Sequence, residues 1–236
     1  MTVRRLKVFL VILLIPAALY SQREKVKNRS WYDEKLFHFG FSVGLNTMDF
    51  KITPSQTAFT ADSLFPEITS LNPGINIQIV TDFHPVSYLD IRFLPGVSFG
   101  QRNVIYYKNS SVVNDEQRLE SSFLVFPLIV KYKGTRLNNV RPYFVTGLNY
   151  RYDLAGKKEY DDDRPVYIRF KRSDLHYEVG AGMDFYLTFF KLSVEAKMSN
   201  GLRDIMIHEP APGYPQYANA IDRMKSQMWI LSFHFE

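Results

Sequence analysis

Residues 36–46, Leu-Phe-His-Phe-Gly-Phe-Ser-Val-Gly-Leu-Asn, alternate between apolar side chains and small or polar ones. The odd positions from Phe37 to Leu45 are all apolar, and the even positions from His38 to Asn46 are small or polar. A β-strand points alternate side chains to opposite faces, so this segment would be apolar on one face and polar on the other. The pattern predicts a strand whose two faces meet different surroundings.

The same alternation recurs along the rest of the chain. Together with the first segment it defines eight segments: residues 36–46, 74–83, 89–99, 124–132, 144–152, 175–187, 190–198 and 227–235. Their apolar rows contain no charged residue, although 22% of the chain is charged. A soluble β-sandwich also alternates, but its apolar face rarely excludes charge so completely. The sequence therefore predicts an all-β fold, an eight-stranded antiparallel up-and-down transmembrane β-barrel over residues 36–236.

The connections between these segments alternate in length. Long connections are expected at residues 47–73, 101–118, 153–172 and 200–225, and short ones at residues 84–88, 133–140 and around Thr188. Outer-membrane barrels have short periplasmic turns and longer external loops. We therefore expect an outer-membrane location with both termini on the periplasmic side. Pro95 and Pro127 fall inside predicted strands, where a missing N–H group favours a bulge or a strand end.

The first residues have the composition of a targeting segment. Arg4, Arg5 and Lys7 precede an apolar run that is short for a membrane-spanning helix and long enough for a secretory signal core. We predict a cleaved signal peptide at residues 1–21 and a periplasmic tail at residues 22–35. Cleavage would lower 29 basic residues to 26 against 24 acidic ones, leaving a net charge near +2. So small an excess argues against nucleic acid as a partner.

The polar rows carry the charges that would point into the barrel. The expected structural network of the lumen consists of Asp90, Arg92, Lys131, Arg151, Glu178, Asp184, Glu195 and Lys197, and Asp82 and Lys191 lie on the same rows. An eight-stranded barrel is just wide enough to be filled by side chains, and charges removed from water must be paired. Inward glycines such as Gly180 and Gly182 would make room for them. We therefore expect a plugged lumen.

The sequence contains no clear motif for catalysis or for metal binding. His38 and Ser42 could join an inward acid in a hydrolase triad, but no nucleophile-elbow motif is present. Residues 159–163 contain four acidic residues, without the spacing of a helix-loop-helix calcium site. A solvated charge run explains them more simply. The chain has no cysteine, so no disulfide framework exists. We expect no catalytic residue, no cofactor and no metal ligand.

Four segments together resemble the PorT-family barrels of Bacteroidetes. They are Phe-Gly-Phe-Ser-Val-Gly-Leu-Asn at residues 39–46, Phe-Pro-Leu-Ile-Val-Lys-Tyr at 126–132, Arg-Pro-Tyr-Phe-Val-Thr-Gly-Leu-Asn-Tyr-Arg-Tyr-Asp at 141–153, and His-Tyr-Glu-Val-Gly-Ala-Gly-Met-Asp-Phe at 176–185. The namesake of that family is needed for type IX secretion, which carries folded cargo across the outer membrane. The resemblance implies an accessory role in this system and brings no catalytic motif.

Three functions remain open at this stage. The first is the accessory role in type IX secretion, and the second is a general structural or surface-binding barrel. The third, a lipid-modifying enzyme or a small pore, is disfavoured because eight strands leave no open lumen. The expected partners are outer-membrane lipid and lipopolysaccharide, joined by other type IX secretion components under the first hypothesis.

Overall fold

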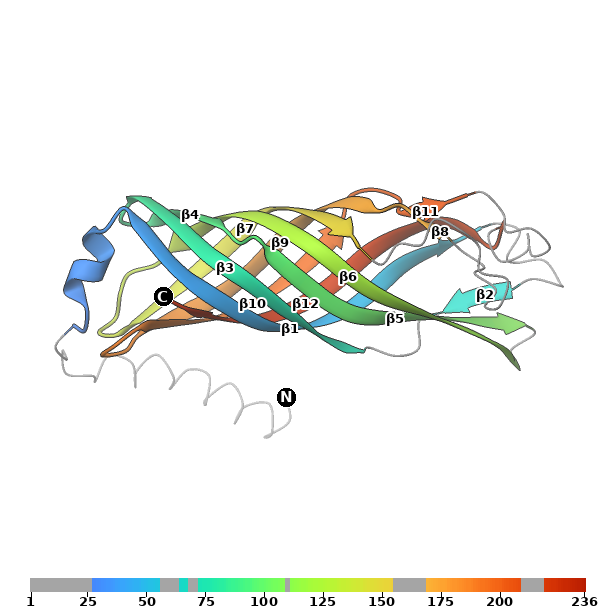
Figure 1. The fold of residues 1–236 in the computed structure, drawn as a ribbon, viewed down its shortest axis with the longest axis horizontal. Helices are drawn as coiled ribbons and strands as arrows, with labels where there is room; N and C mark the ends of the chain where they lie inside the picture. Colours follow the sequence, from blue (N-terminus) through green and yellow to red (C-terminus); the bar gives the residue numbers. More distant parts are fainter. Residues whose placement is uncertain (1–26, 56–63, 68–71, 109–110, 155–168, 209–218) are drawn as a thin grey trace, which may run out of the picture.

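The computed structural model is a closed barrel of eight hydrogen-bonded antiparallel strands, which confirms the predicted fold class (Figure 1). It describes residues 27–55, 64–67, 72–108, 111–154, 169–208 and 219–236. The barrel strands are β1 (Phe37–Pro54), β3 (Pro73–Val86), β4 (Leu89–Phe93) continued by β5 (Gly96–Lys108), β6 (Ser111–Lys133), β7 (Val140–Asp153), β9 (Ser173–Tyr186), β10 (Lys191–Gly201) and β12 (Ile221–Phe235). The predicted signal peptide at residues 1–21 lies outside the described residues.

Strand β1 closes the barrel because it pairs on both of its edges. Leu45 lies opposite Leu231 of β12 on one side and opposite Ile75 of β3 on the other. Every other barrel strand pairs with its neighbours along the chain. This order is the up-and-down arrangement that the sequence predicts.

The two prolines inside predicted strands behave differently. The strand is interrupted at Leu94 and Pro95, where the Leu94 N–H group donates to the Pro127 carbonyl (3.0 Å) and the Pro95 carbonyl accepts from Ile79 N–H (2.9 Å). The predicted strand end at Pro95 is therefore confirmed. At Pro127 the prediction is wrong, because β6 continues in register past it. The Asn149 side-chain oxygen accepts from the adjacent Phe126 N–H group (3.2 Å) and helps to hold the strand there.

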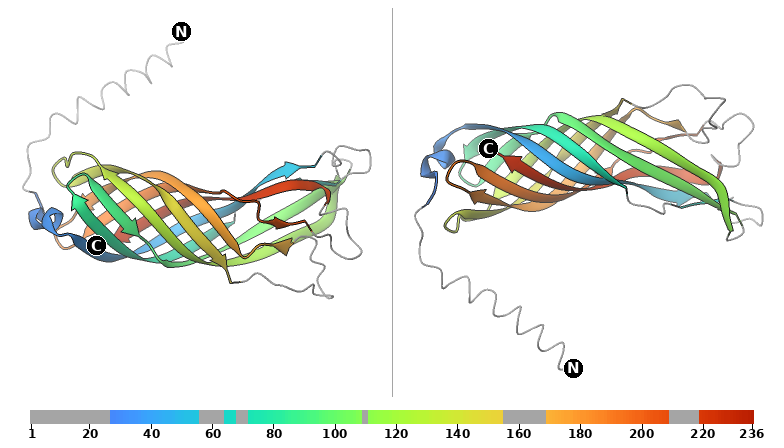
Figure 2. Two further views of the ribbon diagram at one scale, coloured as in Figure 1. Left: turned by 90° about the horizontal axis from the view of Figure 1, so that it is seen from above. Right: turned by 60° about the horizontal axis from the view of Figure 1, so that its bottom comes forward.

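The two ends of the barrel differ in their connections. The short turns and the 3-10 helix η1 (Ser30–Glu34) lie at one end, together with Glu236, and we call this the terminal end (Figures 1 and 2). The short strands β2 (Leu64–Glu67), β8 (Arg169–Phe170) and β11 (Met206–Ile207) lie at the opposite end, which we call the loop end. As predicted, the short connections therefore lie at one end of the barrel and the long connections lie at the other.

Several strands run further toward the loop end than the sequence predicts. The predicted loop at residues 101–118 is wrong, because β5 and β6 continue as a hairpin to Lys108 and Ser111. Strand β1 likewise extends to Pro54, and β12 begins at Ile221. Beyond the membrane a strand no longer needs an apolar outer row, so backbone pairing continues where the alternation that marked the strand has disappeared.

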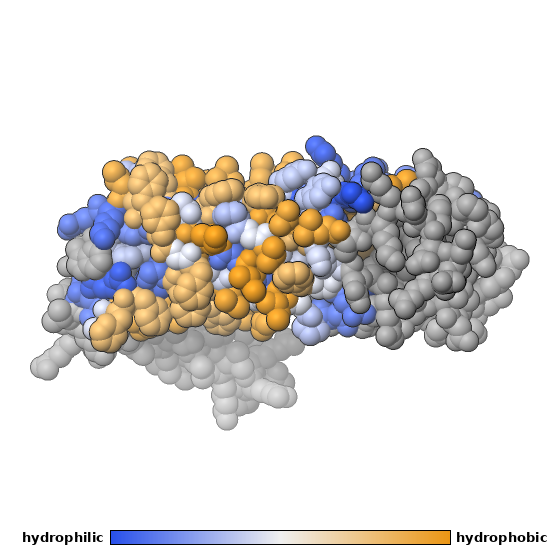
Figure 3. All heavy atoms as spheres, in the orientation of Figure 1, coloured by the Kyte–Doolittle hydropathy of each residue, from blue (hydrophilic) through white to orange (hydrophobic). Residues whose placement is uncertain are grey.

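The predicted apolar rows face outward. Phe39 and Phe144 are each 68% exposed and Ile79 is 61% exposed, whereas their neighbours along the strands point inward. On the face shown, hydrophobic side chains cover the half of the barrel nearer to η1, with polar side chains on both sides (Figure 3). From Phe37 to Thr47 the outer row of β1 spans about 33 Å along the strand, or roughly 25 Å along the axis of a tilted barrel. That height fits the hydrocarbon layer.

Aromatic residues with polar tips border this lipid-facing belt. Tyr88 and Tyr132 are exposed near the terminal end, with their rings in edge contact at 6.2 Å. Tyr150 and Trp229 are exposed on the loop-end side. Such rings place one side in lipid and the other in the headgroup layer. Among the described residues, no helix is long and apolar enough to cross a membrane.

Candidate functional site: a charged lumen closed at both ends

Arg92 is at the centre of the ion pairs nearest the terminal end. Its guanidinium donates to both carboxylate oxygens of Asp82 (2.6 and 2.7 Å) and to Glu236 (2.8 Å). The second oxygen of Glu236 lies 2.7 Å from the Lys191 ammonium. A planar guanidinium suits this bidentate recognition of a carboxylate. Glu236 is absent from the predicted network, although it continues the inward row of β12 by one further position.

Lys131 and Asp184 form a second buried pair beside the first. The ammonium lies 2.9 and 2.8 Å from the two carboxylate oxygens, and the Ser193 hydroxyl also donates to Asp184 (2.5 Å). The same ammonium stands 3.9 Å above the Tyr143 ring, a cation–π contact. Hydrogen bonds of this kind offset part of the large cost of removing both charges from water.

Glu195 connects the two halves of the network. It accepts a hydrogen bond from the Tyr143 hydroxyl (3.1 Å), and its oxygens lie 3.7 Å from Arg92 and 3.6 Å from Lys197. His234 also lies 3.6 Å from it, on the inward row of β12. Glu195 is therefore surrounded by groups from four strands.

Glu178 is the acid nearest the loop end. Lys197 lies 3.0 Å from it and Arg151 lies 3.6 Å from it. The Asn149 amide donates to it at 2.6 Å and the Ser199 hydroxyl at 3.1 Å. All of these groups are buried. Five of the eight predicted residues, Arg92, Glu195, Lys197, Glu178 and Arg151, thus lie in one chain of ion pairs that runs along the lumen. Lys131 and Asp184 form a separate pair, which contacts this chain through Tyr143.

Asp90 is the predicted residue that stands apart. Although it lies opposite Lys131 in the β4–β6 register, its partners are Lys133 (2.6 Å) and His84. Lys133 falls in the predicted short connection at residues 133–140, so this pair was not predicted.

The central charges balance. The cations Arg92, Lys131, Arg151, Lys191 and Lys197 face the anions Asp82, Glu178, Asp184, Glu195 and Glu236, and the side chains of all ten are at most 3% exposed. Equal numbers of opposite charges leave the lumen neutral, which is the condition for burying so many ions at once.

Tyr32 of η1 covers the terminal mouth of this network. Its ring stacks on His38 with centroids 3.9 Å apart, and the Lys191 ammonium lies 4.7 Å from the ring centre. Its hydroxyl donates to Glu236 (2.7 Å). Burial raises the pKa of the Tyr32 phenol well above its ordinary value, so the phenol stays a hydrogen-bond donor at neutral pH.

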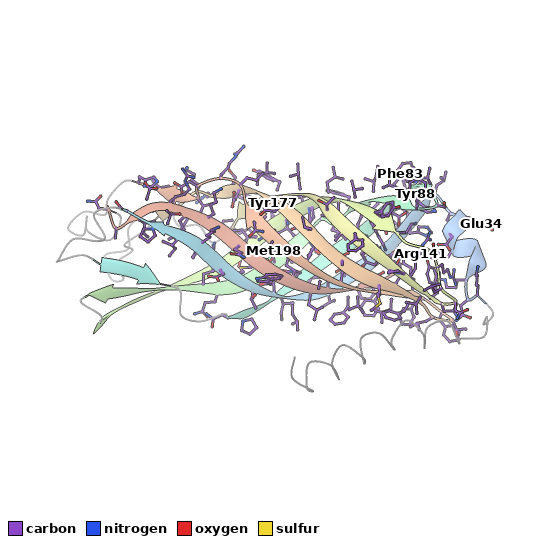
Figure 4. All side chains as sticks on the ribbon, turned by 180° about the vertical axis from the view of Figure 1, so that it is seen from behind. Glu34, Phe83, Tyr88, Arg141, Tyr177 and Met198 are labelled. Carbon is purple, nitrogen blue, oxygen red and sulfur yellow. The ribbon has the colours of Figure 1, made fainter. Side chains whose placement is uncertain are left out.

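Asp33 fastens η1 to the turns around the mouth. Its carboxylate lies 3.2 Å from Arg136 and 3.3 Å from Arg141, and it accepts a hydrogen bond from the Tyr186 hydroxyl (3.0 Å). Figure 4 shows Arg141 and Glu34 together at this end of the barrel. The alternation of side chains carries no information about η1, so these contacts could not be predicted from the sequence.

The lumen becomes apolar near the loop end. Its inward residues there form a cluster of Met48, Phe123, Val125, Met228 and Ile230. Beyond it, the Arg102 guanidinium lies 4.5 Å from the Phe50 ring and 5.9 Å from the Phe170 ring, which are stacked on each other. The barrel is thus filled by apolar and aromatic side chains above the charged section.

The structure separates the residues once considered for catalysis. His38 stacks on Tyr32, and Ser42 lies opposite His234 and Gln78. A different chain, Ser199 to His176 (3.2 Å) to Asp174 (2.9 Å), resembles a triad.

This second chain belongs to the lumen network. The hydroxyl of Ser199 also accepts from Arg151 (3.0 Å) and donates to Glu178, and all of these side chains are buried. Within the described residues, no group of three or more His, Cys, Asp or Glu side chains could hold a metal ion. The acidic residues 159–163 lie outside them.

A family model for the outer membrane protein beta-barrel domain matches residues 20–206. The chain belongs to this family. The closed barrel, the lipid-facing belt and the family match together make it an outer-membrane β-barrel protein. No curated protein matches the chain.

Two solved structures are similar to this barrel. The outer membrane protein OprG from Pseudomonas aeruginosa is 13% identical with a TM-score of 0.49, and the match covers 84% of this chain and 93% of OprG. The N-terminal β-barrel domain of Pseudomonas aeruginosa OprF is 12% identical with a TM-score of 0.33, and the match covers 84% of this chain and all of that domain (100%).

Proposed function

We propose that this outer-membrane barrel is a non-enzymatic, non-conducting accessory component of type IX protein secretion. The observation that carries the non-conducting part is the lumen, which ion pairs fill from Glu236 to Glu178 and which Tyr32 and the Met48–Met228 layer cover at its two ends. With the described side chains filling the barrel in this way, we expect no path for a solute and no substrate pocket inside it. Its function then resides in surfaces that contact other molecules.

The secretion role rests on the resemblance of four segments to PorT-family barrels. Two features of the fold suit an accessory component. The β5–β6 hairpin extends past the belt at the loop end, and η1 lies at the terminal end. Each end therefore offers a segment to a partner, on opposite sides of the membrane.

Orientation follows the general rule for such barrels. Short turns face the periplasm and longer loops face outward. We therefore place the terminal end, with η1 and Glu236, in the periplasm, and the loop end outside the cell.

A general structural or surface-binding barrel is the second candidate. The feature that favours it is the self-contained network, in which the buried charges pair with one another inside the barrel. Such a barrel would be stable without any partner and could serve the membrane alone.

Gene deletion in the source organism separates the two candidates. Cargo of type IX secretion is followed in periplasm and medium, and the chain is restored from a plasmid. Accumulation of cargo in the periplasm, relieved by restoration, is the result we expect. Normal release of cargo would overturn the secretion role and leave the structural barrel.

A restored variant makes this test sharper. Replacing residues 103–118 by Asn-Gly shortens the β5–β6 hairpin while keeping Arg102 and Leu119 as the last register pair. If the hairpin contacts the secretion machinery, this variant should insert normally, as heat-modifiable migration in gels would show, and still fail to restore cargo release.

A further inference from the structure

The outward face of the barrel changes from apolar to basic just beyond the lipid-facing belt. On β1 the outer row runs through Leu45, Thr47, Asp49 and Lys51, and on β12 the paired row runs through Leu231, Trp229, Gln227 and Lys225. Lys51 lies directly opposite Lys225 in the strand register, and Arg223 follows two residues away on the same row, opposite Thr53. Three cations therefore line one seam of the barrel.

The arrangement of these cations is unfavourable without an anion. Side chains directly opposite each other on paired strands have Cβ atoms about 4.5–5.5 Å apart, and like charges there are destabilising. Lys51 and Arg223 are exposed and Lys225 is half-buried. No carboxylate among the described residues makes an ion pair with Lys51, Arg223 or Lys225.

Three acids lie near this seam, and none of them makes an ion pair with its cations in the described part of the chain. Asp204 accepts a hydrogen bond from the Met224 N–H group (3.1 Å) and contacts His208. The Asp49 carboxylate accepts a hydrogen bond from the Phe50 N–H group (2.7 Å), in its own strand. Asp222, next to Arg223, is exposed at the strand start, where the register shifts between Thr53 and Pro54. Lys51 and Lys225 therefore face each other with no carboxylate of the described residues at ion-pair distance.

The seam lies a few ångströms beyond the headgroup layer, within reach of its phosphates for a long side chain. Lys51 follows Thr47 by four residues, so it lies about 10 Å beyond the Trp229 level along the axis of a tilted barrel. Each headgroup layer is roughly 5–8 Å thick. A lysine side chain can reach back along the barrel wall by several ångströms and bring its ammonium to the phosphates.

We propose that Lys51, Lys225 and Arg223 bind the phosphate groups of a phosphorylated glycolipid in the outer leaflet. The lipid chains would lie against the apolar row of Leu45 and Leu231, with Trp229 at the boundary. The site uses the orientation given above and is independent of any role in secretion. A barrel that lacks cargo-related function would still carry it.

Thermal unfolding in a neutral detergent tests the site, with purified lipid A as the added ligand. We expect lipid A to raise the thermal unfolding midpoint of the wild-type chain. It should bind the triple variant Lys51→Gln, Lys225→Gln, Arg223→Gln more weakly, by a factor on the order of ten or more. The matched control is Lys27→Gln, Lys35→Gln, Arg203→Gln, which removes the same charge from exposed positions outside the row of Lys51, Lys225 and Arg223 and should bind lipid A as the wild type does.

The lipid-free midpoint provides a second readout. Because the triple variant removes a like-charge pair, it should unfold at the same or a higher temperature than wild type without lipid, so weaker lipid binding cannot be ascribed to misfolding. Equal lipid A binding by the triple variant would overturn the site. Equal stabilisation by phosphatidylglycerol or by inorganic phosphate at the same phosphate concentration would overturn the glycolipid assignment.

Discussion

The phenol ring of Tyr143 covers Gly182 on the neighbouring strand so closely that a Cβ atom at Gly182 would lie 2.5 Å from the ring. The two residues are register partners on β7 and β9. Glycine is required at such a close approach of a side chain to the backbone. The contact also sets the position of the Tyr143 hydroxyl, which holds Glu195 at the middle of the lumen network.

Replacement of Gly182 by alanine should therefore destabilise the barrel by about 1–3 kcal/mol, because the ring or the backbone must move. Urea unfolding in lipid vesicles measures the change. Gly134→Ala is the matched control, since a Cβ atom there would meet nothing closer than 3.2 Å. Equal losses for both variants would show that the Tyr143 contact is not the cause.

Breaking the Lys131–Asp184 pair from one side should be costly. Lys131→Met leaves the Asp184 carboxylate buried without its cation, and we expect a loss of about 3–5 kcal/mol. The double variant Lys131→Met, Asp184→Leu should lose less, because no unpaired charge remains. A double-mutant cycle in the same unfolding assay gives the coupling energy. A double variant that is less stable than the single one would contradict the pairing.

Charge should be tolerated inside the barrel and rejected outside it. Phe41→Arg, on the lipid-facing row, should cost about 2–4 kcal/mol if the position lies near the bilayer midplane. Leu192→Arg should behave in the same way. Gln78→Lys, on the inward row, should cost clearly less. Comparable losses at both faces in the unfolding assay would argue against the lipid-facing assignment.

The fastening of η1 can be tested at Asp33. Asp33→Ala removes the acceptor shared by Arg136, Arg141 and Tyr186, so amide hydrogen exchange at residues 28–35 should become faster. Glu34→Ala is the control because the Glu34 side chain is exposed. Conductance in planar bilayers should stay absent in both variants, because the ion pairs still fill the lumen. An open channel in Asp33→Ala would show that η1 alone closes the barrel.

Acid should loosen the loop end through Asp204. Burial raises the pKa of this carboxyl. Hydrogen bonds from His208 and from the N–H groups of Met224 and Met206 lower the pKa, and together they outweigh burial, so the net shift is downward. A group with a lowered pKa in the folded state stabilises above its unfolded pKa, about 4, and this contribution is lost as pH falls through the folded value. Exchange at β11 should therefore accelerate below about pH 4. In Asp204→Asn this acid-dependent step should be absent.

The strand count, the closure and the outward rows could all be predicted from the sequence. Charged side chains are excluded from the lipid-facing side of each strand, so every second residue along the strand is apolar. Seven of the eight predicted lumen residues lie buried in the central network for the same reason, five in one chain of ion pairs and two in the separate Lys131–Asp184 pair. The pattern cannot reveal which cation pairs with which acid. Asp90 pairs with Lys133 rather than with Lys131, its partner in register. The Lys131 side chain instead reaches Asp184 on β9, and such reach does not follow from strand register.

The structure of the two barrel ends could not be predicted from the alternation of side chains. Tyr32 lies in a polar tail with no periodicity, so its contact with Glu236 has no signal in the sequence. At the loop end Met48 and Met228 point inward, where the membrane rule predicts polar residues. This part of the wall meets water on the outside, and its rows are exchanged accordingly.

The apolar layer of Met48, Phe123 and Met228 gives the two parts of the barrel different responses to temperature. Opening the loop end would bring these side chains into water and carry a positive heat-capacity change, whereas a side chain on the lipid-facing belt stays in lipid when the belt loosens. Cooling should therefore weaken the loop end selectively. One chain joins a part whose stability varies with temperature as in a soluble protein to a part whose stability depends on the surrounding lipid.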